Sequence, residues 1–291
     1  MNRKQLYSSG QASEICSVSK RALRLYESKG LITPDHISDS GYRYFTMETL
    51  RRVQVIRYFL EEVFSLEVAG ELLATNSLDD YEQIFHGQIE KTKQQINYYQ
   101  NRLDSLKGWY ALLCEGNRIK MLGKDNFSLK HIPTAKYMYM EGELDMEDPY
   151  SEAKLETRHY TMAKSDGHSM IDVGGAYTLY FSDYNDRICL VSTEVTLFQE
   201  SYPNSQSHEN IRELSGFLAV SAYHLGPLDK IQDTYKRGLQ WAADHGIKLT
   251  GESFERYVID IYTSDNAEDF ITEILFPVDC ANDDFNYLSN I

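Results

Sequence analysis

The sequence predicts an α+β protein in three parts: a winged helix-turn-helix, a long coiled-coil helix, and a C-terminal domain made of a duplicated strand-helix-strand-strand unit. Three patterns lead to this fold class. Short helical periods alternate with turn residues near the N-terminus, an unbroken heptad pattern follows, and two similar segments fill the remainder. At 291 residues, the chain is long enough for two compact domains and a connector.

The first segment contains two short helices joined by a tight turn. Ser8 and Ser19 each precede a helical period and can act as N-caps. This pattern predicts one helix over residues 10–15 and a second from Ser19 to about Lys29. Gly30 ends the second helix because glycine favours the position after a helix C-terminus.

A wing and a helical region come next. Turn residues surround two short strand-like pieces within residues 31–45, and these turn residues are Pro34, Asp39, Ser40 and Gly41. This arrangement is typical of a wing. From Thr46, apolar residues recur at three and four residues, which predicts a helix and, after a short break, a second one that includes Leu66 and Leu73.

The connector has the clearest periodicity in the sequence. Its repeated positions alternate at spacings of four and three residues, and they are Phe85, Ile89, Thr92, Ile96, Tyr99, Leu103, Leu106, Tyr110 and Leu113. These positions, which we call the seam, predict a coiled-coil helix that Gly116 and Gly123 end. Because one helix cannot bury its own seam, a second copy of the chain is the economical partner. The alternative is a helix that lies on its own C-terminal domain.

The C-terminal part contains an internal repeat of apolar strands and amphipathic helices. The first unit contains residues 135–140, 149–164, 180–183 and 193–195, and the second contains residues 217–223, 227–243, 262–265 and 272–274. Each unit is therefore strand, helix, strand, strand. Two such units predict a pseudo-twofold domain with a groove between them.

Charge is polarised along the chain. The net charge is −15, yet residues 1–60 hold ten Lys and Arg against five Asp and Glu, whereas residues 61–291 hold 19 against 39. A basic end can approach phosphate groups while the acidic remainder is repelled by them. This favours docking through one end of the protein.

The cysteines and the apolar runs exclude several classes of protein. Four separate cysteines with no CxxC pair, Cys16, Cys114, Cys189 and Cys280, argue against a disulfide framework, a zinc site or an iron-sulfur cluster and favour buried, reduced thiols. No apolar run is long enough for a membrane span, and the N-terminus lacks the apolar stretch of a secretory signal. We therefore expect a cytoplasmic protein without metal or cofactor.

Two stretches of sequence resemble known families. The first contains Val18–Glu27, Gly30–Leu31, Pro34, Ser40–Phe45 and Phe64–Leu66, and it is similar to the DNA-binding region of the MerR family. The second contains His224–Pro227, Trp241, Phe254–Tyr257 and Thr272–Pro277, and it resembles the GyrI-like effector domain. The resemblance divides the chain into a DNA-binding domain over residues 1–76, an antiparallel coiled-coil dimerisation helix over 77–116, and an effector domain over 130–291.

The first resemblance implies DNA binding by the second helix and the wing. In a helix-turn-helix, the second helix enters the major groove, where Lys20, Arg21 and Arg24 meet phosphates or guanine edges. The candidate DNA-binding residues are Ser19, Lys20, Arg21, Arg24, Tyr26, Tyr42, Arg43 and Tyr44. For Tyr26 and Tyr44, the alternative is that both side chains fill the small core.

The composition of the C-terminal part favours a flat or lipophilic cation as the ligand. Residues 130–291 contain 28 Asp and Glu against 12 Lys and Arg, together with 13 Tyr. Strand alternation over residues 254–262 puts Glu255, Tyr257, Ile259 and Ile261 on one face. A carboxylate in the groove is costly while the groove is empty and favourable when a cation arrives.

The second resemblance points to Glu255 as that carboxylate, with Glu273 and Glu194 as the next candidates. The candidate effector-binding residues, which we expect to line one space, are Glu255, Tyr257, Glu273, Glu194, Tyr180, Tyr177, Tyr235, Trp241 and Phe270. The alternative is that the aromatic residues belong to the core and the acids to the solvated surface.

Together the resemblances imply a ligand-responsive transcription regulator and not an enzyme. Such a protein binds double-stranded promoter DNA as a homodimer, acts with RNA polymerase, and distorts the promoter spacer when a small molecule binds. Two alternatives stay open. One is a drug-sequestering protein, and the other is a weak hydrolase with Glu255 as its base, although no Ser or Cys nucleophile stands beside a histidine in the sequence.

Overall fold

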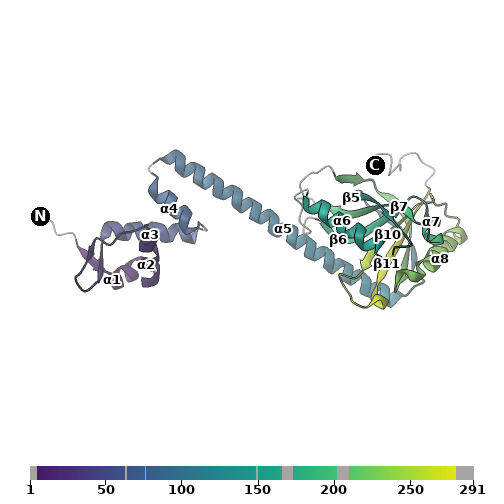
Figure 1. Cartoon of the computed structure of the whole chain (residues 1–291), viewed down its shortest axis with the longest axis horizontal. Coiled ribbons are helices and arrows are strands. Elements are labelled where there is room, and N and C mark those ends of the chain that lie inside the picture. The colour runs from purple at the N-terminus through teal and green to yellow at the C-terminus, as the bar shows by residue number, and fades with distance from the viewer. Residues whose placement is uncertain are drawn as a thin grey trace. The chain divides into compact units, whose positions relative to one another are not determined.

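The structure is a computed structural model that describes residues 5–62, 64–75, 77–148, 150–165, 173–201 and 210–279. It divides into two units, Met1–Ile96 and Asn97–Ile291, and helix α5 (Leu78–Leu122) contributes to both (Figure 1). Residues 280–291 of the predicted effector domain, with Cys280, lie outside the described residues.

The first unit combines short helices with a small antiparallel sheet. The helices are α1 (Ser9–Cys16), α2 (Lys20–Ser28), α3 (Met47–Glu61) and α4 (Leu66–Ala74), and the strands are β1 (Leu6–Ser8), β2 (His36–Ile37) and β3 (Arg43–Thr46). The strand order is β1-β3-β2. The winged helix-turn-helix prediction is confirmed.

Local sequence explains where these helices begin and end. Ser8 and Gln11 form a capping box at α1, and the Ser19 hydroxyl accepts a hydrogen bond from the Ala22 backbone N at 3.0 Å. The chain turns between α1 and α2 at Ser17, which has a left-handed φ of 51°. Both predicted N-caps are therefore present.

The core of this unit joins α2 to the wing. Leu23 and Tyr26 of α2, Phe45 of the wing, and Leu50 and Ile56 of α3 are buried in one cluster. Tyr26 is only 5% exposed, so its ring fills the core. The core alternative for Tyr26 is therefore the one that the structure supports.

Helix α5 is longer than the sequence predicted. It continues through Gly116 to Leu122 and ends before Gly123, which has a left-handed φ of 80°. The prediction that Gly116 breaks the helix is wrong. Gly116 is instead a point of close packing, because a Cβ atom there would lie 2.6 Å from Cγ1 of Ile259.

One face of α5 is buried within the chain, and the face that carries the seam is exposed. The residues of α5 that are buried within the chain are Asn101, Ser105, Leu112, Gly116 and Ile119. In contrast, every seam residue is exposed, from Phe85 at 40% to Tyr110 at 69%. The helix does lie on the C-terminal domain, but it does so through a face other than the seam.

The second unit contains an antiparallel eight-stranded sheet among its described residues. The strands are β4 (Phe127–Ile132), β5 (Ala135–Leu144), β6 (Val173–Phe181), β7 (Thr193–Ser201), β8 (Ile211–Leu214), β9 (Phe217–Leu225), β10 (Ser253–Ile259) and β11 (Ile271–Pro277). Their order is β4-β9-β11-β10-β6-β7-β5-β8. The predicted duplication is confirmed, because β5-β7-β6 mirrors β9-β11-β10 and the two halves meet where β6 pairs with β10.

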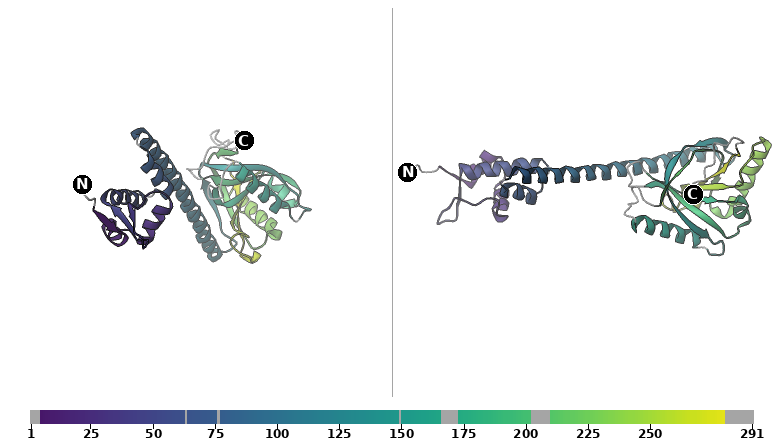
Figure 2. Two further views of the ribbon diagram at one scale, coloured as in Figure 1. Left: turned by 60° about the vertical axis from the view of Figure 1, so that its left-hand side comes forward. Right: turned by 90° about the horizontal axis from the view of Figure 1, so that it is seen from above.

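Helices cover both faces of this sheet. The helices are α6 (Ser151–Ser165), α7 (Tyr184–Cys189) and α8 (Ile231–Asp244), with 3-10 turns η1 (Leu228–Lys230) and η2 (Ala267–Asp269). Tyr235 of α8 packs against Ile274 and Phe276, whereas Leu112 and Ile119 of α5 pack against Ile271. In the right panel of Figure 2, α5 and α6 lie on opposite sides of the sheet. This places α5 on one face and α6 and α8 on the other.

The end of β10 differs from the prediction. A register shift lies between Tyr257 and Ile259, and the strand ends there. Ile259 therefore packs in the cluster of Leu112 on the α5 side, and Ile261 is 63% exposed beyond the strand. The predicted common face of Glu255, Tyr257, Ile259 and Ile261 is wrong because the irregularity interrupts strand alternation.

Two of the described cysteines are exposed. Cys16 is buried as predicted, but Cys114 and Cys189 are exposed, so the prediction of buried thiols is wrong for these two. Within the described ranges, no helix has the length and apolar character needed to cross a membrane, and no three His, Cys, Asp or Glu side chains are grouped so that they could hold a metal ion.

We expect alanine to have opposite effects at two glycines of α5. Gly87→Ala should stabilise the protein by about 0.5–1 kcal/mol, because alanine is the better helix former and the new Cβ meets no atom within 4 Å. Gly116→Ala should destabilise it by about 1–2 kcal/mol, because its Cβ collides with Ile259. Urea unfolding of the full chain measures both changes, and equal midpoints for the two variants would contradict the close packing of α5.

Candidate functional site

The N-terminal unit presents cations on one face of α2. Lys20, Arg21 and Arg24 are all exposed, whereas Leu23 on the opposite face is buried. Ser19 is also exposed, and its hydroxyl is used by the N-cap of α2. The three cations are therefore available to an anionic partner, and Ser19 fixes where the helix begins.

The wing is held against α2 by an ion pair. Nε of Arg43 lies 2.7 Å from Oε2 of Glu27, so Arg43 positions the wing. Tyr42 at the tip is 67% exposed, and the half-buried Tyr44 ring lies 5.9 Å from that of His36. Of these wing residues, Tyr42 is the one whose side chain is most available for a new contact.

A hollow separates the start of α1, helix α2 and the wing. It has a volume of about 370 Å³, and the residues that line it include Gly10, Lys20, Arg24 and Tyr42. Cationic side chains beside the start of a helix attract phosphate groups, because the first backbone N–H groups of a helix have no partner within it. This unit therefore has the chemistry of a nucleic-acid interface.

In the C-terminal unit, Glu255 lies at the centre of a buried ion pair. Nε of Arg187 donates to Oε1 of Glu255 at 2.8 Å, and the hydroxyl of Tyr235 donates to the same oxygen at 2.8 Å. The Tyr257 hydroxyl lies 3.5 Å from the other oxygen. Three predicted effector residues, Glu255, Tyr235 and Tyr257, are therefore brought together on the face that α6 and α8 cover.

The charge on Glu255 is already compensated. Its side chain is 0% exposed, and that of Arg187 is 6% exposed. Burial opposes the charge on Arg187, but the adjacent Glu255 carboxylate holds the pKa of the guanidinium above its usual range. The prediction of a costly, unpaired carboxylate at Glu255 is wrong, because Arg187 neutralises the charge of Glu255.

Glu273 lies on the opposite face of the sheet, in a second network. Its carboxylate accepts hydrogen bonds from Nζ of Lys130 at 2.7 Å, Nε of Arg256 at 2.7 Å and the Ser221 hydroxyl at 2.6 Å. Burial alone would raise the pKa of Glu273, but Arg256 and Lys130 lower it to about 2. Arg256 also pairs with Glu115, so this network ties α5 to the sheet.

The remaining predicted effector residues are scattered. Tyr180 donates to Oε1 of Glu252 at 2.8 Å and packs against Phe254 on the α5 side of the sheet. Phe270 is half-buried after η2, and Glu194 is exposed on β7. Trp241 stacks against the rings of Phe127 and His245. The prediction that all nine residues line one space is wrong, because strand alternation sends the strand residues to both faces of the sheet, while Trp241 lies on α8 and Phe270 follows η2.

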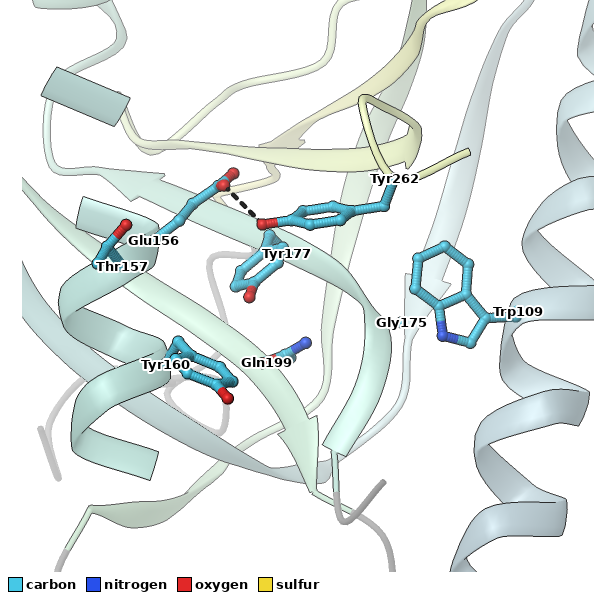
Figure 3. A pocket seen from close by; sticks show the side chains of 8 residues that line it. All are labelled: Trp109, Glu156, Thr157, Tyr160, Gly175, Tyr177, Gln199 and Tyr262. Carbon is cyan, nitrogen blue, oxygen red and sulfur yellow. Dashed lines mark hydrogen bonds between the residues drawn. The ribbon is translucent and has the colours of Figure 1, made fainter. Parts of the chain in front are cut away.

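One cavity of the C-terminal unit combines aromatic rings with a carboxylate. Its volume is about 430 Å³, and it is lined by Trp109, Glu156, Thr157, Tyr160, Gly175, Tyr177, Gln199 and Tyr262 (Figure 3). Helix α5 supplies Trp109, and α6 supplies Glu156, Thr157 and Tyr160. We call the four aromatic residues and Glu156 the cage.

The geometry of the cage is fixed by direct contacts. The Tyr262 hydroxyl donates to Oε2 of Glu156 at 3.1 Å, and the ring centroids of Tyr262 and Tyr177 lie 6.1 Å apart. Trp109 lies on Gly175, where a Cβ atom would come within 2.9 Å of the indole ring. Burial, and then repulsion from Glu152, raises the pKa of Glu156 to about 7.

Sequence reasoning found only Tyr177 of the cage. Trp109 is a large aromatic residue directly beside the seam position Tyr110, and Glu152 and Glu156 are four residues apart on one helix face. These two features were present in the sequence. Their meeting with Tyr262 depends on how α5 and α6 pack on the sheet, which no local pattern contains.

We expect the buried ion pair to be essential for stability. Arg187→Met should destabilise the protein by about 3–5 kcal/mol, because it leaves the Glu255 carboxylate buried without a counter-charge. Adding Glu255→Gln should recover most of this loss. Lys93→Met is the matched control, because Lys93 pairs with Glu90 at an exposed position, and it should cost less than about 1 kcal/mol. Chemical denaturation measures all three, and equal losses for Arg187→Met and Lys93→Met would refute the role of the pair.

Two family models match this chain. Residues 7–76 match the MerR HTH family regulatory protein, and residues 125–279, more than half of the chain, match the GyrI-like small molecule binding domain. Both matched ranges agree with the fold of the unit in which they lie.

Individual proteins are similar over different lengths. The HTH-type transcriptional regulator CueR of Escherichia coli is 38% identical over 61 residues, which cover 21% of this chain and 45% of CueR, so the chain spans less than half the length of that relative. The multidrug-efflux transporter 2 regulator of Bacillus subtilis is 20% identical over 94% of this chain and 97% of its own length. A cryo-EM structure of an EcmrR-DNA complex covers 94% of this chain and 99% of that chain, with 24% identity and a TM-score of 0.43. On the two family models, the chain belongs to the GyrI-like small-molecule-binding family over more than half its length and has a MerR HTH regulatory domain as its N-terminal part.

Proposed function

We propose that the protein is a ligand-responsive transcription regulator that binds double-stranded promoter DNA in the cytoplasm. The observation that supports this most is the cationic surface of Lys20, Arg21 and Arg24 on a helix that a helix-turn-helix presents to the major groove. Tyr42 at the wing tip supplies a flanking contact to the DNA backbone. The rest of the chain is acidic and is repelled by DNA phosphates, so DNA docks at this end only.

We propose that the DNA-bound form is a homodimer through α5. Its seam is exposed from Phe85 to Leu113, although another face of the same helix is buried against the sheet. A contiguous apolar seam in water favours a second copy of the same helix, arranged antiparallel. Two linked DNA-binding units can then bend or twist a promoter for RNA polymerase.

The cage is the proposed effector site, and its ligand class is an aromatic or lipophilic cation. Four aromatic rings provide π-faces, and Glu156 provides a negative charge among them. Because Trp109 belongs to α5, a ligand in the cage contacts the proposed dimerisation helix directly. Hydrolysis with Glu255 as a base has less support, because both carboxylate oxygens already accept hydrogen bonds from Arg187.

Charge reversal on α2 tests DNA binding. Arg21→Glu with Arg24→Glu should weaken binding to the chain's own upstream region by roughly 100-fold and reduce the salt dependence, because two phosphate or base contacts are replaced by repulsion. Lys29→Glu, at the exposed C-cap of α2, is the control and should change binding little. Gel shifts over a salt series measure this. A double variant that binds the DNA as tightly as the wild type does would contradict the α2 surface, whereas a wild-type chain without sequence-selective binding would favour the drug-sequestering alternative.

Charges placed on the seam test the dimer. Ile96→Glu with Leu103→Glu should convert the dimer to a monomer, because two carboxylates would be buried against the partner helix. Gln94→Glu lies off the seam on the same exposed stretch and should leave the dimer intact. Sedimentation equilibrium distinguishes the outcomes, and a monomeric wild-type chain would rule out this arrangement.

A further inference from the structure

We propose that Glu156, and not Glu255, receives the cationic ligand, and that binding of the cation displaces a proton from the Glu156 carboxyl group into solution. This inference rests on the proposed function of the cage as the effector site.

Glu255 is a poor receiver because its interactions are already made. Arg187 donates to both of its oxygens, at 2.8 and 3.3 Å, and Tyr235 donates to Oε1. A cation that displaced Arg187 would leave a buried guanidinium without a counter-charge. The bound cation would then lie beside the positive charge of Arg187, which repels it.

Glu156 is placed to act as a receiver because it lines the cavity itself. The hydrogen bond from the Tyr262 hydroxyl to Oε2 fixes the direction of the carboxyl group. Rings of Trp109, Tyr160 and Tyr177 border the same space (Figure 3). An ammonium group with apolar substituents can contact these π-faces and the carboxylate together, as aromatic cages do.

The surroundings of Glu156 disfavour its negative charge while the cavity holds no cation. The groups that face it are Glu152, His159 and Tyr160 of α6, Asp260 and Tyr262 after β10, Tyr177 of β6, Gln199 of β7 and Trp109 of α5. The ionisable members that act on its charge, Glu152 and Asp260, are both carboxyl groups, and burial raises the pKa of each. His159 is buried, which lowers its pKa to about 4 and keeps its ring neutral near pH 7.

The sign of the proton coupling follows from these neighbours. The pKa of Glu156 is about 7, well above its usual value, so the group is mostly protonated at pH 6 and mostly ionised at pH 8. A cation binds the ionised form more tightly and therefore shifts the equilibrium towards it. The affinity for a permanent cation should rise by about tenfold between pH 6 and pH 8, in proportion to the ionised fraction.

Isothermal titration of the full chain with phenyltrimethylammonium tests the inference, because this cation cannot itself titrate. At pH 6, the wild type should release close to one proton per ligand, measured in buffers of different ionisation enthalpy. Glu156→Gln should weaken binding at pH 8 by at least about tenfold and remove the pH dependence. Tert-butylbenzene, the neutral isostere, should show no pH dependence.

The controls separate this inference from the proposed function. Glu143→Gln removes an exposed carboxylate of β5 outside the cage and should change nothing. No binding of phenyltrimethylammonium to the wild type, or a Glu156→Gln variant that keeps the wild-type affinity and pH profile, would overturn the inference. A gel shift on the same preparation tests DNA binding separately: loss of DNA binding with intact, proton-linked cation binding would overturn the proposed regulator and leave the role of Glu156 standing.

Discussion

The packing of α5 on the sheet is the contact on which the C-terminal unit depends. Gly116 allows the helix to approach Ile259, and Glu115 pairs with Arg256, which also binds Glu273. The apolar contact sets the distance between helix and sheet, whereas the ion pairs set the position along the helix, because buried charges must keep their partners. With that position fixed, Trp109 lies on Gly175 two turns earlier along α5 and completes the cage.

The same constraint divides the surface of α5 between two tasks. A coiled-coil seam occupies a narrow stripe of a helix, which leaves the other faces free for different partners. Here one face is buried against the sheet while the seam stays exposed, so intramolecular packing does not compete with the proposed dimerisation. Asn101 and Ser105 are small or polar residues of the buried face, and they lie between the seam positions in sequence. A search for apolar periodicity therefore detects the seam and overlooks the face that positions the cage.

Sequence patterns predicted the parts of the fold that local chemistry determines. Ser8 and Ser19 cap helices as expected, and the internal repeat became two mirrored halves of one sheet. The candidate site was harder, because side chains distant in sequence define it. The resemblance points to Glu255, but the charge of Glu255 is compensated by Arg187, which lies 68 residues earlier, and no local pattern links the two residues. The predicted aromatic residues are scattered because strand alternation places Tyr177 and Tyr180 on opposite faces of the sheet, while Trp241 and Phe270 lie outside the strands.

The arrangement of the cage also limits what a ligand can do to α5. A ligand shifts a conformational equilibrium only by the difference between its affinities for the two states. If only residues of one rigid body lined the cavity, a change in the position of α5 would leave that affinity unchanged. Because Trp109 is on α5 while Glu156 is on α6, the affinity of the proposed ligand must depend on where α5 lies. By reciprocity, a partner that shifted α5 against the sheet would also change ligand affinity, and the proposed DNA binding and cation binding would then be coupled through this one ring.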